Sequence, residues 1–198
     1  MSSRDKILAT VTKNQPEGRD LPALPAASAA GGDHAAVFMS TLEAIGGAVY
    51  VVSGFDRIAT ILKEKFPDAR RIINGVTETP ADIGDPHTLE NVDLAILPAH
   101  FGVAENGACW ITEKQMVQRA LPFITQHLVL VLPKSAIVAD MHAAYERIDA
   151  GDPYGFATFI AGPSKTADIE QSLVLGAHGP ASLTVFLLDG QQSDAGYY

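Results

Sequence analysis

Cysteine is almost absent from this sequence. Cys109 is the only cysteine among its 198 residues. One thiol cannot form a disulfide within the chain, and it cannot by itself complete a cysteine-ligated zinc site or an iron–sulfur cluster. Any such centre is therefore expected on a partner, and no cofactor is expected to be bound by this chain alone.

Positive charge and long apolar runs are also scarce. The chain has 14 Lys and Arg against 23 Asp and Glu, a formal charge of −9, so it repels phosphate backbones and anionic lipids on average. The longest strongly apolar run, Leu128 to Leu132, is far shorter than the roughly 20 residues that span a bilayer. The charged start, Met1 to Lys6, does not resemble a signal peptide. We therefore expect a cytoplasmic protein that has no membrane span and does not bind nucleic acid.

Several motifs with known chemistry are missing. The sequence contains no G-x-G-x-x-G after its first strand, no G-x-x-x-x-G-K-[ST] and no G-x-S-x-G, which excludes the standard dinucleotide, P-loop and α/β-hydrolase sites. Its histidines form no H-E-x-x-H motif and no pair at i, i+4, so no metal site is expected. They are His34, His87, His100, His127, His142 and His178.

The length suits one domain, with a short extension at each end. Residues 1–32 comprise an expected helix over 3–12 and an arm rich in Pro, Ala and Gly. Residues 33–189 carry the apolar pattern of a folded domain, and residues 190–198 are expected to be a flexible tail. With 47 % hydrophobic and 19 % charged residues, the chain has a globular composition.

Strand and helix patterns alternate through this domain. Asp33 can cap a helix with Phe38, Leu42 and Ile45 on one face. A second helix is expected from a capping box at residues 53–56 to Pro67, and a third over residues 135–148. The expected strands cover residues 48–52, 92–97, 128–132, 156–160 and 183–188.

This alternation predicts the fold class. Near-continuous apolar strands are typical of a parallel sheet covered on both faces, so we expect a three-layer α/β/α sandwich with a mostly parallel sheet. The segment 105–113 contains the tight-turn pair Asn106-Gly107 and a strand too close to its predecessor for a crossover helix. One antiparallel hairpin is therefore expected.

The densest polar segment is Gly162–Glu170, which follows an expected strand and is expected to begin a short helix ending near Gly176. Loops at the carboxyl ends of strands line the ligand crevice of open α/β sheets, and a helix start favours an anion. Ser164, Thr166, Asp168 and Glu170 are therefore ligand-binding candidates, although on a regular helix Asp168 and Glu170 cannot both face one pocket. The alternative is that these residues only cap the helix and complement its dipole.

Two further loops carry candidates. His178 lies in Gly176–Pro180, where it can act as acid, base or carboxylate ligand or serve only as a surface histidine. Glu105, in the turn at 104–107, is either a second proton-transfer group or an ordinary turn carboxylate. The loop glycines Gly107 and Gly179 are included as ligand-binding candidates. Cys109 is more simply a core residue and is not a candidate.

Together the segments 104–107, 162–170 and 176–180 resemble the lactate-utilisation protein C family, also called the LUD domain. The similarity covers residues 33–189 and departs from the family pattern at Asn106 and Trp110. The resemblance implies a fold of the sugar-isomerase and coenzyme-A-transferase type and a role in oxidising lactate to pyruvate. It also implies partner proteins that carry iron–sulfur clusters, and a small carboxylate metabolite held by the candidate residues.

Three functions remain open at this point. The first is a non-redox subunit of a lactate-oxidising system, with Ser164 and Thr166 holding a carboxylate while His178 or Glu105 handles a proton. Two electrons leave lactate, and no side chain here accepts them. The second is a stand-alone isomerase, ligase or acyl transferase acting on a phosphorylated or carboxylate metabolite. The third is a regulatory or scaffolding module.

Overall fold

The structure, a computed structural model, describes residues 2–20, 32–78, 83–149, 153–169 and 172–190. Its helices are α1 (Ser3–Lys13), α2 (His34–Ala44), α3 (Phe55–Lys65), α4 (Leu121–Ile124), α5 (Met141–Asp149) and the 3₁₀ turns η1 (Pro86–Leu89) and η2 (Lys134–Ala136). Its strands are β1 (Ala48–Val52), β2 (Ile72–Asn74), β3 (Leu94–Pro98), β4 (Phe101–Val103), β5 (Ala108–Thr112), β6 (His127–Pro133), β7 (Ile137–Val138), β8 (Ala157–Ile160), β9 (Lys165–Ile169), β10 (Ser172–Leu175) and β11 (Ser182–Leu188).

Five parallel strands form the central sheet, in the order β1-β11-β6-β3-β2. β11, the last strand among the described residues, lies between β1 and β6, with Ser182 opposite His127 and Leu188 opposite Pro133. Nearly every residue of β3, β6 and β11 is buried, as expected for strands covered on both faces. The predicted strands at 48–52, 92–97, 128–132 and 183–188 are thereby confirmed.

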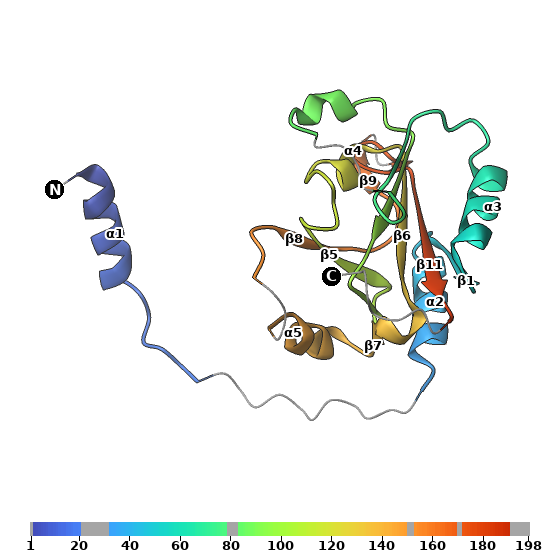
Figure 1. Ribbon diagram of the computed structural model, residues 1–198. Coiled ribbons are helices and arrows are strands. Elements are labelled where there is room, and N and C mark those ends of the chain that lie inside the picture. Colours follow the sequence, from blue (N-terminus) through green and yellow to red (C-terminus); the bar gives the residue numbers. More distant parts are fainter. Residues whose placement is uncertain (1, 21–31, 79–82, 150–152, 170–171, 191–198) are drawn as a thin grey trace.

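Different layers cover the two faces of this sheet (Figure 1). On one face Val129 and Val131 pack in a cluster with Ile58 of α3. On the other face Leu130 packs in a cluster with Phe38 of α2, because successive side chains of a strand point to opposite faces. The helices at 34–44 and 55–65 therefore cover opposite faces, as the alternating pattern predicts.

A second, four-stranded sheet lies beside α2 in the order β7-β4-β5-β8. Strands β4 and β5 form the predicted antiparallel hairpin, with Phe101 opposite Trp110. The outer face of this sheet carries Phe101, Val103 and Trp110, which cluster with Ala144 of α5. The α/β sandwich with a mostly parallel central sheet and additional antiparallel strands is confirmed.

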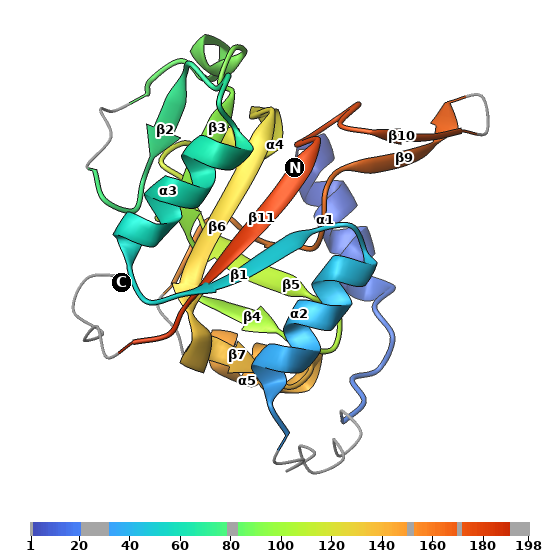
Figure 2. The same ribbon diagram turned by 90° about the vertical axis from the view of Figure 1, so that its right-hand side faces the viewer.

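The prediction of a helix after Gly162 is wrong. Strands β9 and β10 form an antiparallel hairpin there, with Lys165 opposite Leu175 and Thr166 opposite Val174, and it projects from the body of the molecule (Figure 2). Ser, Thr and Asp also form capping patterns, so the local sequence suggested a helix start. The cross-strand partners that decide for a strand lie about ten residues further along the chain.

Other boundaries also differ from the expectations. Helix α5 begins at Met141 rather than near residue 135, because Ile137 and Val138 pair with β4 as strand β7. Helix α3 begins after Gly54 without a side-chain capping bond, so the expected capping box is wrong. The hairpin partner of β5 is the separate short strand β4, and residues 157–160 pair with β5 instead of joining the parallel sheet.

Helix α1 confirms the expected helix over residues 3–12, and the side chain of Ser2 accepts a hydrogen bond from the Asp5 N–H at its start. Residues 21–31 of the expected arm and residues 191–198 of the expected tail lie outside the described residues. Among the described helices, none has the length and apolar character to cross a membrane.

Thr184 of β11 provides a first test of the core. Its side chain is fully buried, and its hydroxyl is the buried side-chain group without a hydrogen-bond partner in the part of the chain that is described. We expect Thr184→Val to raise the free energy of unfolding by about 1 kcal/mol, because an unsatisfied buried hydroxyl is removed. Chemical denaturation measures this change.

The matched control is Thr125→Val. Thr125 is also buried, but its hydroxyl donates to the His127 carbonyl at 3.0 Å. We therefore expect Thr125→Val to lower the free energy of unfolding by about 1 kcal/mol. Equal losses in the two variants would contradict the interpretation of Thr184.

His127 predicts a pH dependence of stability. Its half-buried ring stacks on Phe66, with 4.5 Å between ring centroids, and its Nδ1 lies 2.8 Å from the Ser182 hydroxyl. Burial lowers the pKa of His127 below its usual 6.5, opposed by the Asp93 carboxylate and reinforced by Lys65. The unfolded chain therefore binds this proton more readily, so stability is lost as the pH falls through 6.5 and the lower folded-state pKa.

We expect His127→Asn to show a smaller loss of thermal stability between pH 7 and about 5 than the wild type. His142→Gln, which alters an exposed histidine of α5, should retain the wild-type slope. If the stability of His127→Asn depended on pH as steeply as that of the wild type, His127 would not be the cause of this pH dependence.

Candidate functional site

The two polar loops near the end of the chain meet in space. The Ser164 N–H donates to the Pro180 carbonyl at 2.9 Å, and the Gly176 N–H donates to the Ser164 carbonyl at 3.0 Å. The Ala181 N–H in turn donates to the Gln126 carbonyl, directly before β6 begins. The loops therefore converge at the amino ends of β6 and β11. The expectation that they lie at the carboxyl ends of the parallel strands is wrong.

Two glycines allow this close approach. A β-carbon at Gly179 would lie 3.1 Å from the Ser164 β-carbon and 3.3 Å from its hydroxyl oxygen. Gly162 has φ +73°, and a β-carbon there would lie 3.1 Å from the Ile45 carbonyl oxygen. Gly179, a predicted candidate, thus lies directly against Ser164, another predicted candidate.

Lys165 adds a positive charge that the candidate set omitted. Its ammonium nitrogen lies 3.3 Å from where a β-carbon on Gly46 would be, so the α2–β1 loop joins the site. Lys165 is exposed and has no acidic partner within the part of the chain that the structure describes. It is the only basic residue of 162–170, and that isolation in an acidic chain was the sequence signal for it. We name Ser164, Lys165, Gly179 and Gly46 the amino-edge site.

Among the described residues, the other predicted candidates of these two loops form no hydrogen bond with Ser164. His178 is exposed beside Gly179, and Thr166 is half-buried in β9. The backbone of Asp168 lies in β9, where alternate residues share one face, so the helical argument about Asp168 and Glu170 does not apply. The Asp168 side chain and the whole of Glu170 lie outside the described residues.

Glu105 has a structural partner. Its carboxylate oxygen accepts a hydrogen bond from the Met141 N–H at 3.0 Å, at the start of α5. Asp140 accepts from the Ala143 N–H at 2.9 Å on the same helix. Both carboxylates therefore satisfy N–H groups that a helix start leaves open, which accounts for Glu105 without any chemistry.

Gly107 is buried in the turn between β4 and β5. A β-carbon there would lie 2.9 Å from the Leu42 α-carbon, so the turn packs directly on the backbone of α2. Since Ile45 of the same segment contacts Gly162, the last turn of α2 connects the hairpin turn with the amino-edge site. This contact requires a glycine for packing, whatever else Gly107 does.

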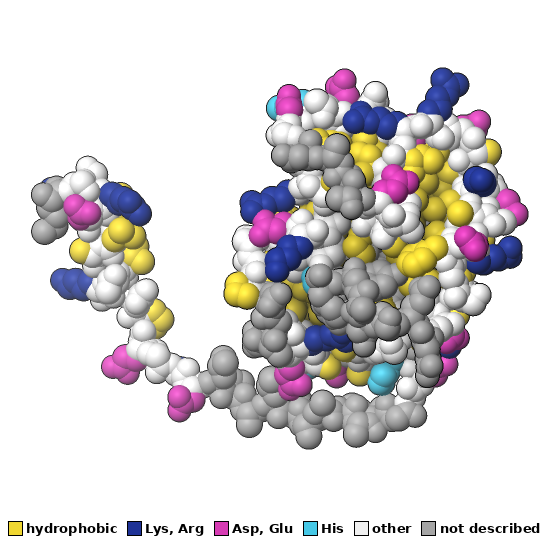
Figure 3. Space-filling view, in the orientation of Figure 1, with side chains coloured by type: hydrophobic (Ala, Val, Ile, Leu, Met, Phe, Trp, Pro, Cys, Tyr) yellow, Lys and Arg dark blue, Asp and Glu magenta, His cyan; other side chains and the backbone are white. Residues whose placement is uncertain are grey.

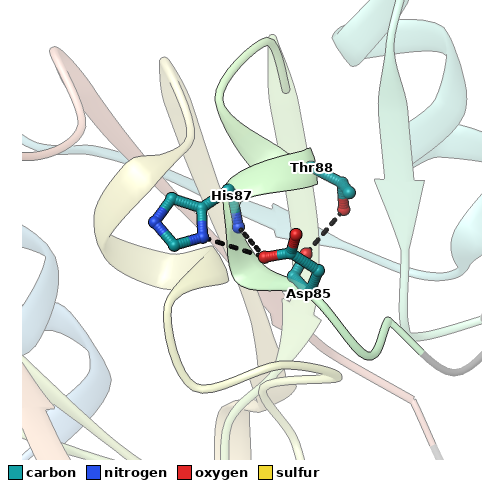
Figure 4. A network of polar contacts seen from close by, with 3 residues as sticks. All are labelled: Asp85, His87 and Thr88. Atoms are coloured by element: carbon teal, nitrogen blue, oxygen red, sulfur yellow. Dashed lines mark hydrogen bonds and ion pairs between the residues drawn. The ribbon is translucent and has the colours of Figure 1, made fainter.

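Another polar cluster is local and exposed (Figure 4). Asp85 accepts a hydrogen bond from the His87 N–H at 3.0 Å and lies 2.9 Å from the His87 ring nitrogen, while the Thr88 hydroxyl donates to the Asp85 carbonyl. The backbone hydrogen bond from His87 lowers the pKa of Asp85. This geometry is that of a capped 3₁₀ turn, so we do not assign it a chemical role.

Cys109 lies in the core of β5. Its thiol is fully buried, and burial raises its pKa to about 12, so it is neither a nucleophile nor a metal ligand at neutral pH. In the described ranges no three His, Cys, Asp or Glu side chains gather as a metal site would require.

The fold and these loops define an α/β domain whose characteristic segments lie between η1 and β11. The model of the LUD domain matches residues 86–188, a region that includes every candidate residue of the sequence analysis. The chain belongs to the LUD domain family.

Curated relatives share this region. Lactate utilization protein C from Bacillus pumilus is 32 % identical over 113 residues, which cover 52 % of this chain and 47 % of the relative. The protein of the same name from Oceanobacillus iheyensis is 29 % identical over 105 residues, 50 % of this chain and 45 % of the relative. This chain thus matches about half the length of these relatives.

A solved structure supports the fold. A DUF162 family protein from Deinococcus radiodurans aligns with a TM-score of 0.57 at 20 % identity, covering 79 % of this chain and 96 % of that one.

Glu105 provides a test that separates structure from chemistry. We expect Glu105→Ala to lower the free energy of unfolding by about 1 kcal/mol, because the α5 start loses an acceptor. Glu105→Gln still offers a side-chain oxygen as acceptor, so its free energy of unfolding should fall by less. Denaturation of both variants measures the effect. Unchanged stability of Glu105→Ala would contradict the capping role.

Proposed function

We propose that this chain is a component of a lactate-utilisation system and binds a small carboxylate, lactate or pyruvate, at the amino-edge site. The observation that carries the proposal is the contact of Ser164 with Pro180 and Gly179, together with the Lys165 ammonium beside Gly46 at the end of α2, where Ile45 contacts Gly162. The name of the curated relatives supports the pathway, and the family match includes both loops.

The side chains fit a carboxylate chemically. The Lys165 ammonium is an exposed cation in a chain of formal charge −9, so it provides the local attraction that an anion needs. The Ser164 hydroxyl is a hydrogen-bond donor next to it in sequence, and Thr166 is the next hydroxyl along β9. A charged donor attracts a carboxylate, and a neutral donor orients it.

His178 is the group that we propose for the proton. Conversion of lactate to pyruvate removes two electrons and two protons. In our proposal the imidazole of His178 accepts the hydroxyl proton, since it is exposed beside the site and a neutral imidazole has a ring nitrogen that accepts a proton. The electrons and the second proton pass to cytoplasmic partner proteins that carry iron–sulfur clusters, because the side chains of this chain do not accept electrons.

Ligand-dependent thermal unfolding tests the binding site. We expect lactate and pyruvate to raise the unfolding temperature of the wild type, and Lys165→Gln to weaken this binding by about tenfold or more through the loss of a charge-assisted contact. Lys63→Gln removes an exposed cation from α3 and should leave binding unchanged. His178→Gln should retain binding but slow lactate oxidation in extracts that contain the partner proteins.

Other results would overturn the proposal. Stabilisation by sugar phosphates or coenzyme A, without an effect of lactate or pyruvate, favours a stand-alone isomerase, ligase or acyl transferase. Rapid lactate oxidation by the purified chain would refute the subunit role. If lactate and pyruvate raised the unfolding temperature equally in the wild type and in Lys165→Gln, the carboxylate would bind at a different site.

A further inference from the structure

Helix α1 carries an uncovered apolar face. The side chains of Ile7, Leu8 and Val11 are 63 %, 53 % and 54 % exposed, and no residue of α1 is buried. Helical spacing places Arg4 on the same face, three, four and seven residues before them. An isolated helix of 11 residues is marginal in water, so contact along this face would stabilise α1.

The charge of α1 is opposite to that of the rest of the chain. Arg4, Lys6 and Lys13 against Asp5 give α1 a formal charge of +2, which leaves −11 on the rest of a chain whose total is −9. Apolar and basic side chains lie side by side on this helix (Figure 3). The charges therefore attract α1 to an acidic protein surface, and the chain itself offers one.

The free edge of the central sheet provides such a surface. β1 is an edge strand, and Val51 on it is 41 % exposed, while Val37 on the adjacent helix α2 is 48 % exposed. Asp33 lies one helical turn before Val37, at the start of α2. Asp189 lies at the end of the neighbouring strand, where its N–H donates to the Val52 carbonyl. We name Asp33, Val37, Val51 and Asp189 the α2–β1 edge.

One carboxylate of this edge is left in excess. The Lys134 ammonium lies 2.9 Å from the Asp189 carboxylate. Asp33 also raises the pKa of Lys134 by its charge, after the larger effects of the hydrogen bond and charge of Asp189. Within the described residues Asp33 has no ion pair of its own, and one of its oxygens accepts a hydrogen bond from the Ala36 N–H at 3.1 Å. Asp33 is therefore the carboxylate available to a further cation.

We infer that α1 of one copy of this chain packs on the α2–β1 edge of a second copy. Ile7, Leu8 and Val11 cover Val37 and Val51, and Arg4 pairs with Asp33. In the described structure the α1 face is not covered by its own chain, so a second copy provides the matching surface. Reciprocal exchange of α1 gives a closed twofold dimer in which both apolar surfaces are buried.

Sedimentation velocity of the full chain over a wide concentration range tests the dimer. We expect a reversible dimer that Ile7→Ser/Val11→Ser abolishes. Arg4→Gln should weaken dimerisation by about tenfold, within the range of a desolvated charge pair. Lys6→Gln removes the same charge from the opposite side of α1 and should have little effect.

A double-mutant cycle identifies the pairing. Asp33→Ser removes the carboxylate but retains a good helix cap, so α2 should still form. Arg4→Gln and Asp33→Ser should each weaken the dimer, and the double variant should be no weaker than either. Additive losses would refute the Arg4–Asp33 pair.

Other occupants of the α1 face give different results. A chain that is monomeric at every concentration overturns the proposal. Amide exchange protection of residues 3–13 in that monomer would mean that α1 packs on its own chain. A dimer that is insensitive to the α1 substitutions would mean a different interface. Lactate binding is measured separately, so this inference and the proposed function fail independently.

Discussion

The placement of β11 between β1 and β6 is the constraint on which the rest of the structure depends. Its seven residues pair with β6 along their whole length and with β1 over five positions, so β11 joins β1 to the rest of the central sheet. This pairing positions the loop at 176–181 against Gln126, and thereby Pro180 against Ser164. The amino-edge site therefore results from the pairing of β11 within the sheet and not from a local loop motif.

The second determinant of the site is the last turn of α2. It contacts the hairpin turn through Leu42 and Gly107, and the loop after β8 through Ile45 and Gly162. Segments separated by more than fifty residues are thus held against a single helix end. Such contacts leave no room for a side chain, so the glycines of the family segments have a packing role beside any role in binding.

Much of the fold follows from the sequence. The apolar runs of β3, β6 and β11 and the helical spacing of Phe38 and Leu42 are strong local signals, and the structure confirms them. The errors fall where local and long-range signals disagree. Thr166 and its neighbours suggest a capped helix locally but pair with β10, and Ile137 continues a helical pattern but pairs with β4. Cross-strand partners decide these cases, and periodicity within one segment does not detect them.

The sequence by itself determined the α/β class, the family segments, and the absence of a chain-borne cysteine cluster, because these depend on residue types and their spacing. Only the tertiary structure decided that the loops of Ser164 and Gly179 meet at the amino ends of the strands, that the Lys165 ammonium lies beside Gly46, and that Glu105 caps α5. The physical reason is that these features depend on strand order and on contacts between distant segments, which the burial of the central sheet selects as a whole.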